Sequence, residues 1–209
     1  MKNDKKIILA SKSPRRAQLL TMLGLRFDIK PSKLNENKKT ELSGNLFAEY
    51  WSRKKALSLS QNYPNELIVG ADTIVIVNGE ILGKPRNEEE SFKMLKKLSG
   101  DTHQVITGVT LCCKNKQIIK TFSETTKVSV IEIPNEKIVF YINNFNTLDK
   151  AGSYGIQDWF SIWIKKIDGC YYNVMGLPLS KFYHFHSKIM KEYWDKWKEE
   201  HPNYKDKWK

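Results

Sequence analysis

Cysteine is scarce in this 209-residue chain, and long hydrophobic runs are missing. The three cysteines, Cys112, Cys113 and Cys170, are odd in number and lack the spacing of zinc ligands. We therefore expect neither a disulfide framework nor a structural zinc site. No apolar stretch approaches the roughly 20 residues that a membrane helix needs, so no membrane partner is expected.

The N-terminus also lacks the apolar core of a signal peptide, since only Ile7 to Ala10 is apolar before polar residues return. Glycine and proline are scattered, which excludes a low-complexity segment. The chain is 40% hydrophobic, enough for one sizeable core at this length. We expect a single domain over residues 1–209, located in the cytoplasm.

Positive charge is in excess and is unevenly distributed. The net charge is +12, and residues 1–60 hold 14 lysines and arginines against 5 acidic residues. Such an excess favours a polyanionic partner: a nucleic acid, a membrane surface or a small phosphorylated substrate. Charge alone does not choose among these, and a solvated basic face explains it equally well.

Hydrophobic patterns and turn residues divide the chain into strands and helices. Ser13 and Asn87 are predicted helix caps, because their side chains accept hydrogen bonds from backbone N–H groups of the first turn. Asn78-Gly79 predicts a hairpin after the β-branched segment LIVGADTIVIV, and Asp168-Gly169 predicts another. The predicted strands are residues 7–10, 67–77, 80–82, 103–112 and 117–133, and the predicted helices are residues 14–23, 46–59, 88–98, 134–145 and 179–200. This mixture predicts an α/β fold built on a mixed β-sheet with flanking helices.

The segment SKSPRR connects the first strand to the first helix. A helix N-terminus offers unpaired N–H groups and a favourable dipole to an anion. Arg15 and Arg16 add guanidinium donors suited to phosphate oxygens. A capped surface helix that begins with two arginines is an equally good interpretation of this segment alone.

Asp72 and Thr73 are polar residues inside an apolar strand, where an unpaired carboxylate is costly. Lys84 lies on the returning arm of the hairpin and is expected near the same place. The structural alternatives are a buried ion pair between Asp72 and Lys84, or a carboxylate satisfied by backbone amides. A carboxylate here also suits Mg²⁺, which takes few protein ligands and shares its coordination with substrate phosphates.

The loop DKAGSYGIQ is polar and contains glycine, so its backbone can approach a ligand closely. Gln157 offers both a donor and an acceptor to a nucleobase edge. A plain connecting loop is the commoner meaning of such a string.

Taken together, these segments and several others indicate a function more specifically than any one of them does alone. From about Ile7 to Leu179 the chain carries, in this order, SKSPRR, GADT, GKP, LSG with THQVITGV, DKAGSYGIQ and NVMGLPL. The order and spacing of these segments resemble those of the Maf family of nucleoside triphosphate pyrophosphatases. Residues 179–209 form a C-terminal helix and basic tail beyond the match. The resemblance implies a mixed sheet with a deep cleft between two lobes, similar to inosine triphosphate pyrophosphatases. The loop is similar to that of the branch acting on dTTP and UTP, and the family is often dimeric.

The resemblance also implies roles for individual residues. Asp72 matches the proton acceptor, and Arg16, Thr73 and Gln157 match positions associated with nucleotide selection. Ser11, Ser13 and Arg15 match the phosphate-binding corner. Glu36, Lys55 and Lys84 match charged residues of the cleft. A divalent cation, Mg²⁺ or Mn²⁺, is expected between Glu36 and Asp72.

Two departures from the family pattern affect these expectations. Asp158, Trp159 and Phe160 stand where a glycine-rich continuation is usual, so bulky side chains are expected to reshape the wall of the base pocket. Asn35 stands where an acidic neighbour of Glu36 is common, so the metal site is expected to have one carboxylate fewer.

The expected reaction is hydrolysis of dTTP and UTP, or of modified pyrimidine nucleotides, to the monophosphate and pyrophosphate. The alternative is a nucleotide-sensing or nucleic-acid-binding regulator of cell-division arrest without turnover, supported by the basic N-terminal third. A stable nucleic-acid partner is not expected. A homodimer is implied only by the resemblance, since the sequence itself does not decide the oligomeric state. His184 and His186 are spaced by two, which puts them on different faces of a helix, and both are expected to be exposed rather than metal-bound.

Overall fold

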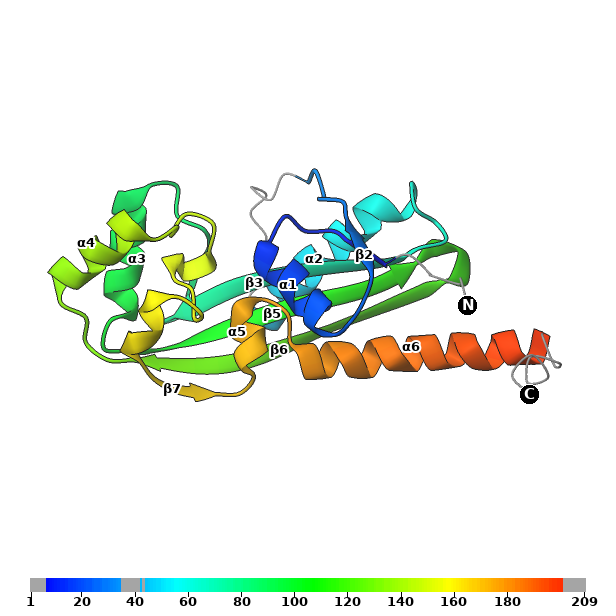
Figure 1. Cartoon of the computed structure of the whole chain (residues 1–209). Coiled ribbons are helices and arrows are strands. Elements are labelled where there is room, and N and C mark those ends of the chain that lie inside the picture. The colour runs from blue at the N-terminus through cyan, green and yellow to red at the C-terminus, as the bar shows by residue number, and fades with distance from the viewer. Residues whose placement is uncertain (1–6, 35–41, 43, 201–209) are drawn as a thin grey trace.

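The computed structural model of the chain describes residues 7–34, 42 and 44–200 (Figure 1). Seven strands form one sheet in the order β2-β1-β3-β5-β6-β7, with β4 paired to β3. The strands are β1 Ile7–Leu9, β2 Phe27–Ile29, β3 Leu67–Val77, β4 Glu80–Leu82, β5 Thr102–Cys113, β6 Ile118–Val130 and β7 Ile164–Asp168. Strand β1 is parallel to β2 and β3, whereas the other pairs are antiparallel. The predicted mixed sheet is therefore confirmed.

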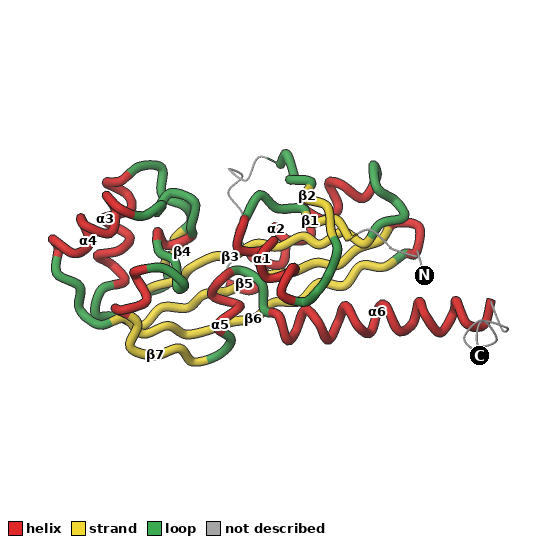
Figure 2. The backbone as a smooth tube through the Cα atoms, viewed as in Figure 1, coloured by secondary structure: helices red, strands yellow, loops and turns green. Residues whose placement is uncertain are grey.

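Helices flank this sheet. They are α1 Pro14–Met22, α2 Gly44–Ser60, α3 Glu88–Leu98, α4 Asn135–Asn144, α5 Tyr171–Met175 and α6 Leu179–Glu200. Figures 1 and 2 show α3 and α4 together at one end of the long strands and α1, α2 and β1 towards the other, while α6 runs past the sheet. In the described part of the chain, no helix is both long enough and apolar enough to cross a membrane.

Local sequence explains the best-predicted elements. The β-branched run of β3 is buried along most of its length, and it ends at Asn78 and Gly79, whose φ angles of 50° and 79° form the predicted turn. The side chain of Asn87 accepts a hydrogen bond from the Glu90 backbone N–H at 2.8 Å and so caps α3 as predicted.

Two glycines let α2 lie directly on the sheet. A Cβ atom at Gly70 of β3 would come within 2.2 Å of the Ser52 carbonyl oxygen, and one at Gly108 of β5 within 2.3 Å of the Ala48 carbonyl group. Side chains larger than hydrogen would push the helix away. This close contact fixes which residues of α2 face the middle of β3.

One edge of β3 is interrupted. Strand β1 pairs with residues 67–69, and β4 pairs with residues 75–77. Among the described strands, none pairs with residues 70–74 on this edge. Because side chains alternate along a strand, Asp72 lies on the α2 face and Thr73 on the opposite face, and both reach the same gap.

Four sequence predictions were wrong or incomplete. Ser13 stands at the N-cap position of α1, but its side chain makes no capping hydrogen bond. Strand β2 was not predicted. Asp168-Gly169 does not turn a hairpin, because helix α5 comes next instead of a strand. His186 is buried, with only 7% of its surface exposed, and its ring stacks on Phe182 at 5.7 Å. The pKa of His186 is lowered by this burial, whereas His184 is exposed as predicted.

Candidate active site

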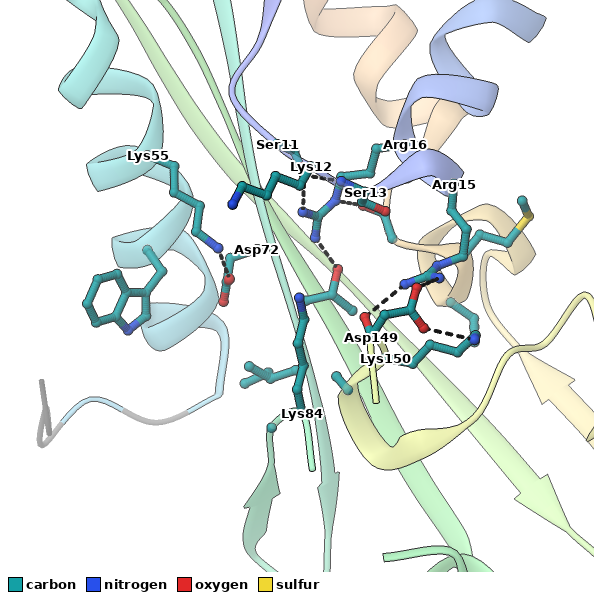
Figure 3. A pocket seen from close by; sticks show the side chains of 18 of the residues that line it. Ser11, Lys12, Ser13, Arg15, Arg16, Lys55, Asp72, Lys84, Asp149 and Lys150 are labelled. Carbon is teal, nitrogen blue, oxygen red and sulfur yellow. Dashed lines mark hydrogen bonds and ion pairs between the residues drawn. The ribbon is translucent and has the colours of Figure 1, made fainter. Parts of the chain in front are cut away.

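A cavity of about 700 Å³ opens at the interrupted edge of β3 (Figure 3). Its wall comes from the β1–α1 corner, the segment after β2, α2, β3, the β4 hairpin arm, the loop before β7 and the end of α5. Nine residues singled out from the sequence line it: Ser11, Ser13, Arg15, Arg16, Lys55, Asp72, Thr73, Lys84 and Gln157. Glu36 lies outside the described residues.

Asp72 forms an ion pair inside this cavity. Its Oδ1 accepts a hydrogen bond from Lys55 Nζ at 2.7 Å, and the two side chains are 10% and 11% exposed. The sequence offered Lys84 as the structural ion-pair partner, but the contact is with Lys55, which α2 carries over β3. Lys84 lines the same cavity from the arm after β4 (Figure 3).

Arg16 is buried and its guanidinium is fixed by neutral oxygens. It donates to Ser11 Oγ at 3.0 Å, to Thr73 Oγ1 at 2.9 Å and to the Gly176 carbonyl at 2.9 Å. Gly176 has a φ of 112°, a conformation suited to glycine, which ends α5 with its carbonyl directed at the arginine. Three separate parts of the chain thereby hold one side chain.

Arg15 points to a different partner. It donates to Asp149 Oδ2 at 2.8 Å and to the Asp149 carbonyl at 3.2 Å, while Lys150 donates to Asp149 Oδ1 at 2.9 Å. Burial disfavours the Asp149 charge, but these hydrogen bonds from Lys150 and Arg15 outweigh it and lower the Asp149 pKa. Sequence reasoning missed Asp149 and Lys150, although both begin the DKAGSYGIQ segment.

The same loop is shaped by its glycines. Gly152 has a φ of 68°, and a Cβ at Gly155 would lie 2.3 Å from the Asp158 carboxylate. Gln157 is exposed at the cavity wall, and its Nε2 donates to Gln18 Oε1 at 3.4 Å. The loop therefore brings its backbone close to the cavity and leaves the Gln157 amide accessible.

The aromatic residues after the loop have another role than expected. Trp159 and Phe160 pack against Tyr141, with ring centroids 6.0 and 5.4 Å apart, and Phe160 also contacts Tyr154 at 4.7 Å. The Tyr141 hydroxyl donates to Asp158 and accepts from the Gly155 backbone. Trp159 and Phe160 are absent from the described cavity lining and pack behind it, so they do not form the wall themselves but support Tyr154, which does.

The carboxylates of the cavity decide whether a metal ion fits. Within residues 7–34, 42 and 44–200, no group of three His, Cys, Asp or Glu side chains gathers closely enough to hold one. Asp72 and Asp149 are the carboxylates of the described lining, and Asp149 is engaged by Arg15 and Lys150. A single carboxylate that shares a cation with substrate phosphates is a common arrangement for Mg²⁺. Asp72 fits it through its second oxygen, because the hydrogen bond from Lys55 goes to Oδ1, whereas both oxygens of Asp149 accept from cationic side chains.

Comparison with known proteins decides the family. The family model described as "Maf-like protein" matches residues 6–189. The chain belongs to the Maf family. The match includes every residue of the described cavity lining, and it continues about ten residues beyond the expected end at Leu179, into α6.

Curated relatives in the Maf family carry a more specific name. A protein from Koribacter versatilis named "dTTP/UTP pyrophosphatase" is 43% identical over 177 residues, covering 85% of this chain and 91% of that protein. One of the same name from Thermosipho africanus is 48% identical over 176 residues, covering 84% and 89%. A solved nucleoside-triphosphatase, or dITP/XTP pyrophosphatase, from Mycobacterium abscessus is 16% identical with a TM-score of 0.41, covering 62% of this chain and 76% of that one. This last likeness is loose and adds nothing to the family assignment.

Proposed function

We propose that this chain hydrolyses dTTP and UTP to the monophosphate and pyrophosphate, and so removes unwanted pyrimidine nucleotides from the cellular pool. The observation that carries the proposal is one carboxylate, Asp72, set among cationic side chains in a single nucleotide-sized cavity. The names of the relatives in the Maf family support the choice of substrate.

The charge of the cavity suits a triphosphate. Six cationic side chains line it against two carboxylates, Asp72 and Asp149. The cationic residues are Lys12, Arg15, Arg16, Lys55, Lys84 and Lys150. Such an excess stabilises the negative charge that accumulates on pyrophosphate as it leaves.

The β1–α1 corner suits the phosphate groups. Ser11 Oγ accepts hydrogen bonds from Arg16 and from the Ser13 backbone N–H at 3.2 Å. The hydroxyl proton of Ser11 is therefore directed to an acceptor other than these two groups, and a phosphate oxygen in the cavity provides one. The N-terminus of α1 favours the same anion.

Asp72 is proposed as the proton acceptor for the water that attacks the α-phosphorus. Lys55 holds the carboxylate in place through the 2.7 Å contact and offsets its charge beside the substrate phosphates. A divalent ion, Mg²⁺ or Mn²⁺, held by Asp72, by Glu36 and by phosphate oxygens, would supply Lewis-acid polarisation of the phosphate when bound.

The Thr73 side of β3 is proposed to select the base. Thr73 and Arg16 meet on this side, and Gln157 lies at the loop with both an amide donor and an amide acceptor. These groups match the hydrogen-bonding edge of a pyrimidine. The cytoplasm is the proposed compartment. The family implies a homodimer, and the molecular mass of the protein in solution tests this.

The test is the identity of the products. Purified protein is incubated with UTP or dTTP and Mg²⁺, and the products are followed by ³¹P NMR. We expect equal amounts of monophosphate and pyrophosphate, and formation of both at least about 10³-fold slower with Asp72→Asn protein prepared in parallel. Release of inorganic phosphate and the diphosphate would contradict the proposal. Salt-sensitive binding of DNA or RNA without turnover would favour the regulator instead.

A further inference from the structure

Thr73 is the first member of a buried chain of hydrogen bonds that leads away from the cavity. Its Oγ1 lies 2.9 Å from Arg16 Nη2 and 2.9 Å from Thr107 Oγ1. Thr107 Oγ1 in turn lies 3.0 Å from the carbonyl oxygen of Asn173. Thr107 and Asn173 are fully buried, so water does not compete for these bonds.

The direction of each bond follows from counting protons. A carbonyl oxygen only accepts, so Thr107 donates its single hydroxyl proton to Asn173. Thr107 Oγ1 then has no proton left for Thr73, and Thr73 must donate its own. Because Arg16 only donates, Thr73 also accepts from it. The one proton of Thr73 is thereby committed to the protein interior.

The far end of the chain is firmly fixed. Asn173 Nδ2 donates to the Val105 carbonyl at 2.9 Å and to Thr126 Oγ1 at 2.9 Å. Thr126 also accepts from the Cys170 backbone N–H at 3.0 Å. These bonds attach α5 to β5 and β6, so the Asn173 carbonyl cannot readily turn away from Thr107.

We propose that Thr107, which does not line the cavity, is a positioning residue that sets substrate specificity by making Thr73 an acceptor towards the cavity. With its proton held by Thr107, the Thr73 oxygen presents only lone pairs to a ligand. It therefore favours a ligand group that donates a hydrogen bond.

This inference rests on the proposed function, and it deepens the choice of base. Uracil and thymine carry a proton on N3, whereas N3 of cytosine is an acceptor. An acceptor-only Thr73 matches the N3–H group and opposes cytosine N3, whose lone pair would face that of the threonine oxygen. Buried groups left unpaired in this way are a strong source of discrimination.

The experiment compares UTP with CTP in kcat and KM. Thr107→Val keeps the side-chain shape but removes the hydroxyl, which frees the Thr73 proton to point into the cavity. We expect KM for UTP to rise about tenfold with kcat changed less, and the preference for UTP over CTP in kcat/KM to narrow by about tenfold. Thr107→Ser restores the hydroxyl and should restore the preference.

Thr110→Val is the matched control. Thr110 lies on the same strand, is equally buried and bonds Ser52 Oγ at 2.9 Å and Thr121 Oγ1 at 3.0 Å, but it belongs to the α2 face and is not in the cavity lining. It should leave the UTP preference unchanged. If Thr107→Val does not fold, Thr107→Ala makes the same test without added bulk.

An unchanged ratio of UTP to CTP in a folded Thr107→Val enzyme, or an equal loss on both nucleotides, would overturn the inference while leaving the proposed function intact. Failure of the wild-type protein to hydrolyse UTP would overturn the proposed function. In that case, calorimetric binding of UTP and CTP to the same variants tests the role of Thr107 independently of turnover. Wild-type protein that binds both nucleotides equally would overturn the inference.

Discussion

The two faces of β3 meet the cavity with different chemistry. On the α2 face, Asp72 is paired with the charged Lys55 at 2.7 Å. On the other face, Arg16 is held by neutral oxygens, among them Thr73 Oγ1 at 2.9 Å. Two neighbouring residues of one strand thus belong to different networks, one built on an ion pair and one on hydrogen bonds from a guanidinium to neutral oxygens.

The difference suggests a division of labour. A carboxylate beside a lysine suits proton transfer and phosphate chemistry, since both groups respond to charge. A fixed guanidinium and a hydroxyl of defined direction suit recognition, since hydrogen-bond direction distinguishes ligands. The gap between β1 and β4 lets both faces act on one substrate.

The largest effect is expected on the α2 face. Asp72→Asn removes the proposed proton acceptor while preserving side-chain size, and kcat should fall by about 10³-fold or more. The measurement is steady-state hydrolysis of UTP together with the midpoint of thermal unfolding.

Asp149→Asn is the control for this change, because Asp149 is the other carboxylate of the described lining. It should reduce kcat by roughly tenfold or less, since it only loosens Arg15 and Lys150. Similar losses in the two variants would remove the special role of Asp72.

A substitution on the Arg16 side of β3, which is proposed to recognise the base, should change KM. Arg16→Lys keeps the positive charge but cannot reproduce three hydrogen bonds in a fixed plane, so KM for UTP should rise by about 30- to 100-fold, with a smaller change in kcat. Arg53→Lys, on the exposed side of α2, is the control and should behave like wild type. A loss confined to kcat would place Arg16 with the catalytic group instead.

Packing on the α2 face is tested by Gly108→Ala. The added methyl would meet the Ala48 backbone at 2.3 Å, so the free energy of unfolding should fall by about 2 kcal/mol or more. Denaturant unfolding measures the change. Gly83→Ala, whose Cβ would meet nothing within 4 Å, should be close to neutral, and equal stability of the two variants would show that α2 can move.

The smallest effect concerns pH and the Thr73 face. His103 on this face is buried and hydrogen-bonds Tyr154 at 2.7 Å, and burial lowers its pKa to about 4. The unfolded chain has an ordinary histidine pKa near 6.5, so it gains a proton first as the pH falls. Between pH 6.5 and 5 the free energy of unfolding should therefore drop by about 1.5 kcal/mol from this residue.

His103→Gln should flatten that dependence when denaturant unfolding is repeated across the pH range. His184→Gln, at an exposed position, should leave it unchanged. A wild-type slope that persists in His103→Gln would assign the pH dependence to other groups.

Much of the framework could be predicted from local sequence. The bounds of β3 and α6 agree with their predictions, because an uninterrupted β-branched run and a long amphipathic pattern depend little on the rest of the fold. Strand β2 is only three residues long and lies at the sheet edge, which leaves no periodicity to detect. The turn at Gly169 has a local sequence signal, but the helix after it depends on tertiary contacts between α5 and the sheet.

The candidate residues could be named from the sequence, but not their partners. Lys55 meets Asp72 because Gly70 and Gly108 let α2 lie close to β3, a tertiary fit that no local pattern shows. Thr107 and Asn173 were missed for a related reason. Each looks like an ordinary polar residue in its own segment, and its importance comes from a hydrogen-bond chain between distant segments.

Binding of UTP to the Asp72→Asn protein, measured by titration calorimetry, tests the division between the two faces most directly. If the α2 face carries out the reaction and the Arg16 face recognises the base, this variant should bind UTP with a Kd within about tenfold of the wild-type KM and prefer it to CTP, yet release no pyrophosphate. If a folded Asp72→Asn variant lost UTP binding as well as turnover, the account would be contradicted.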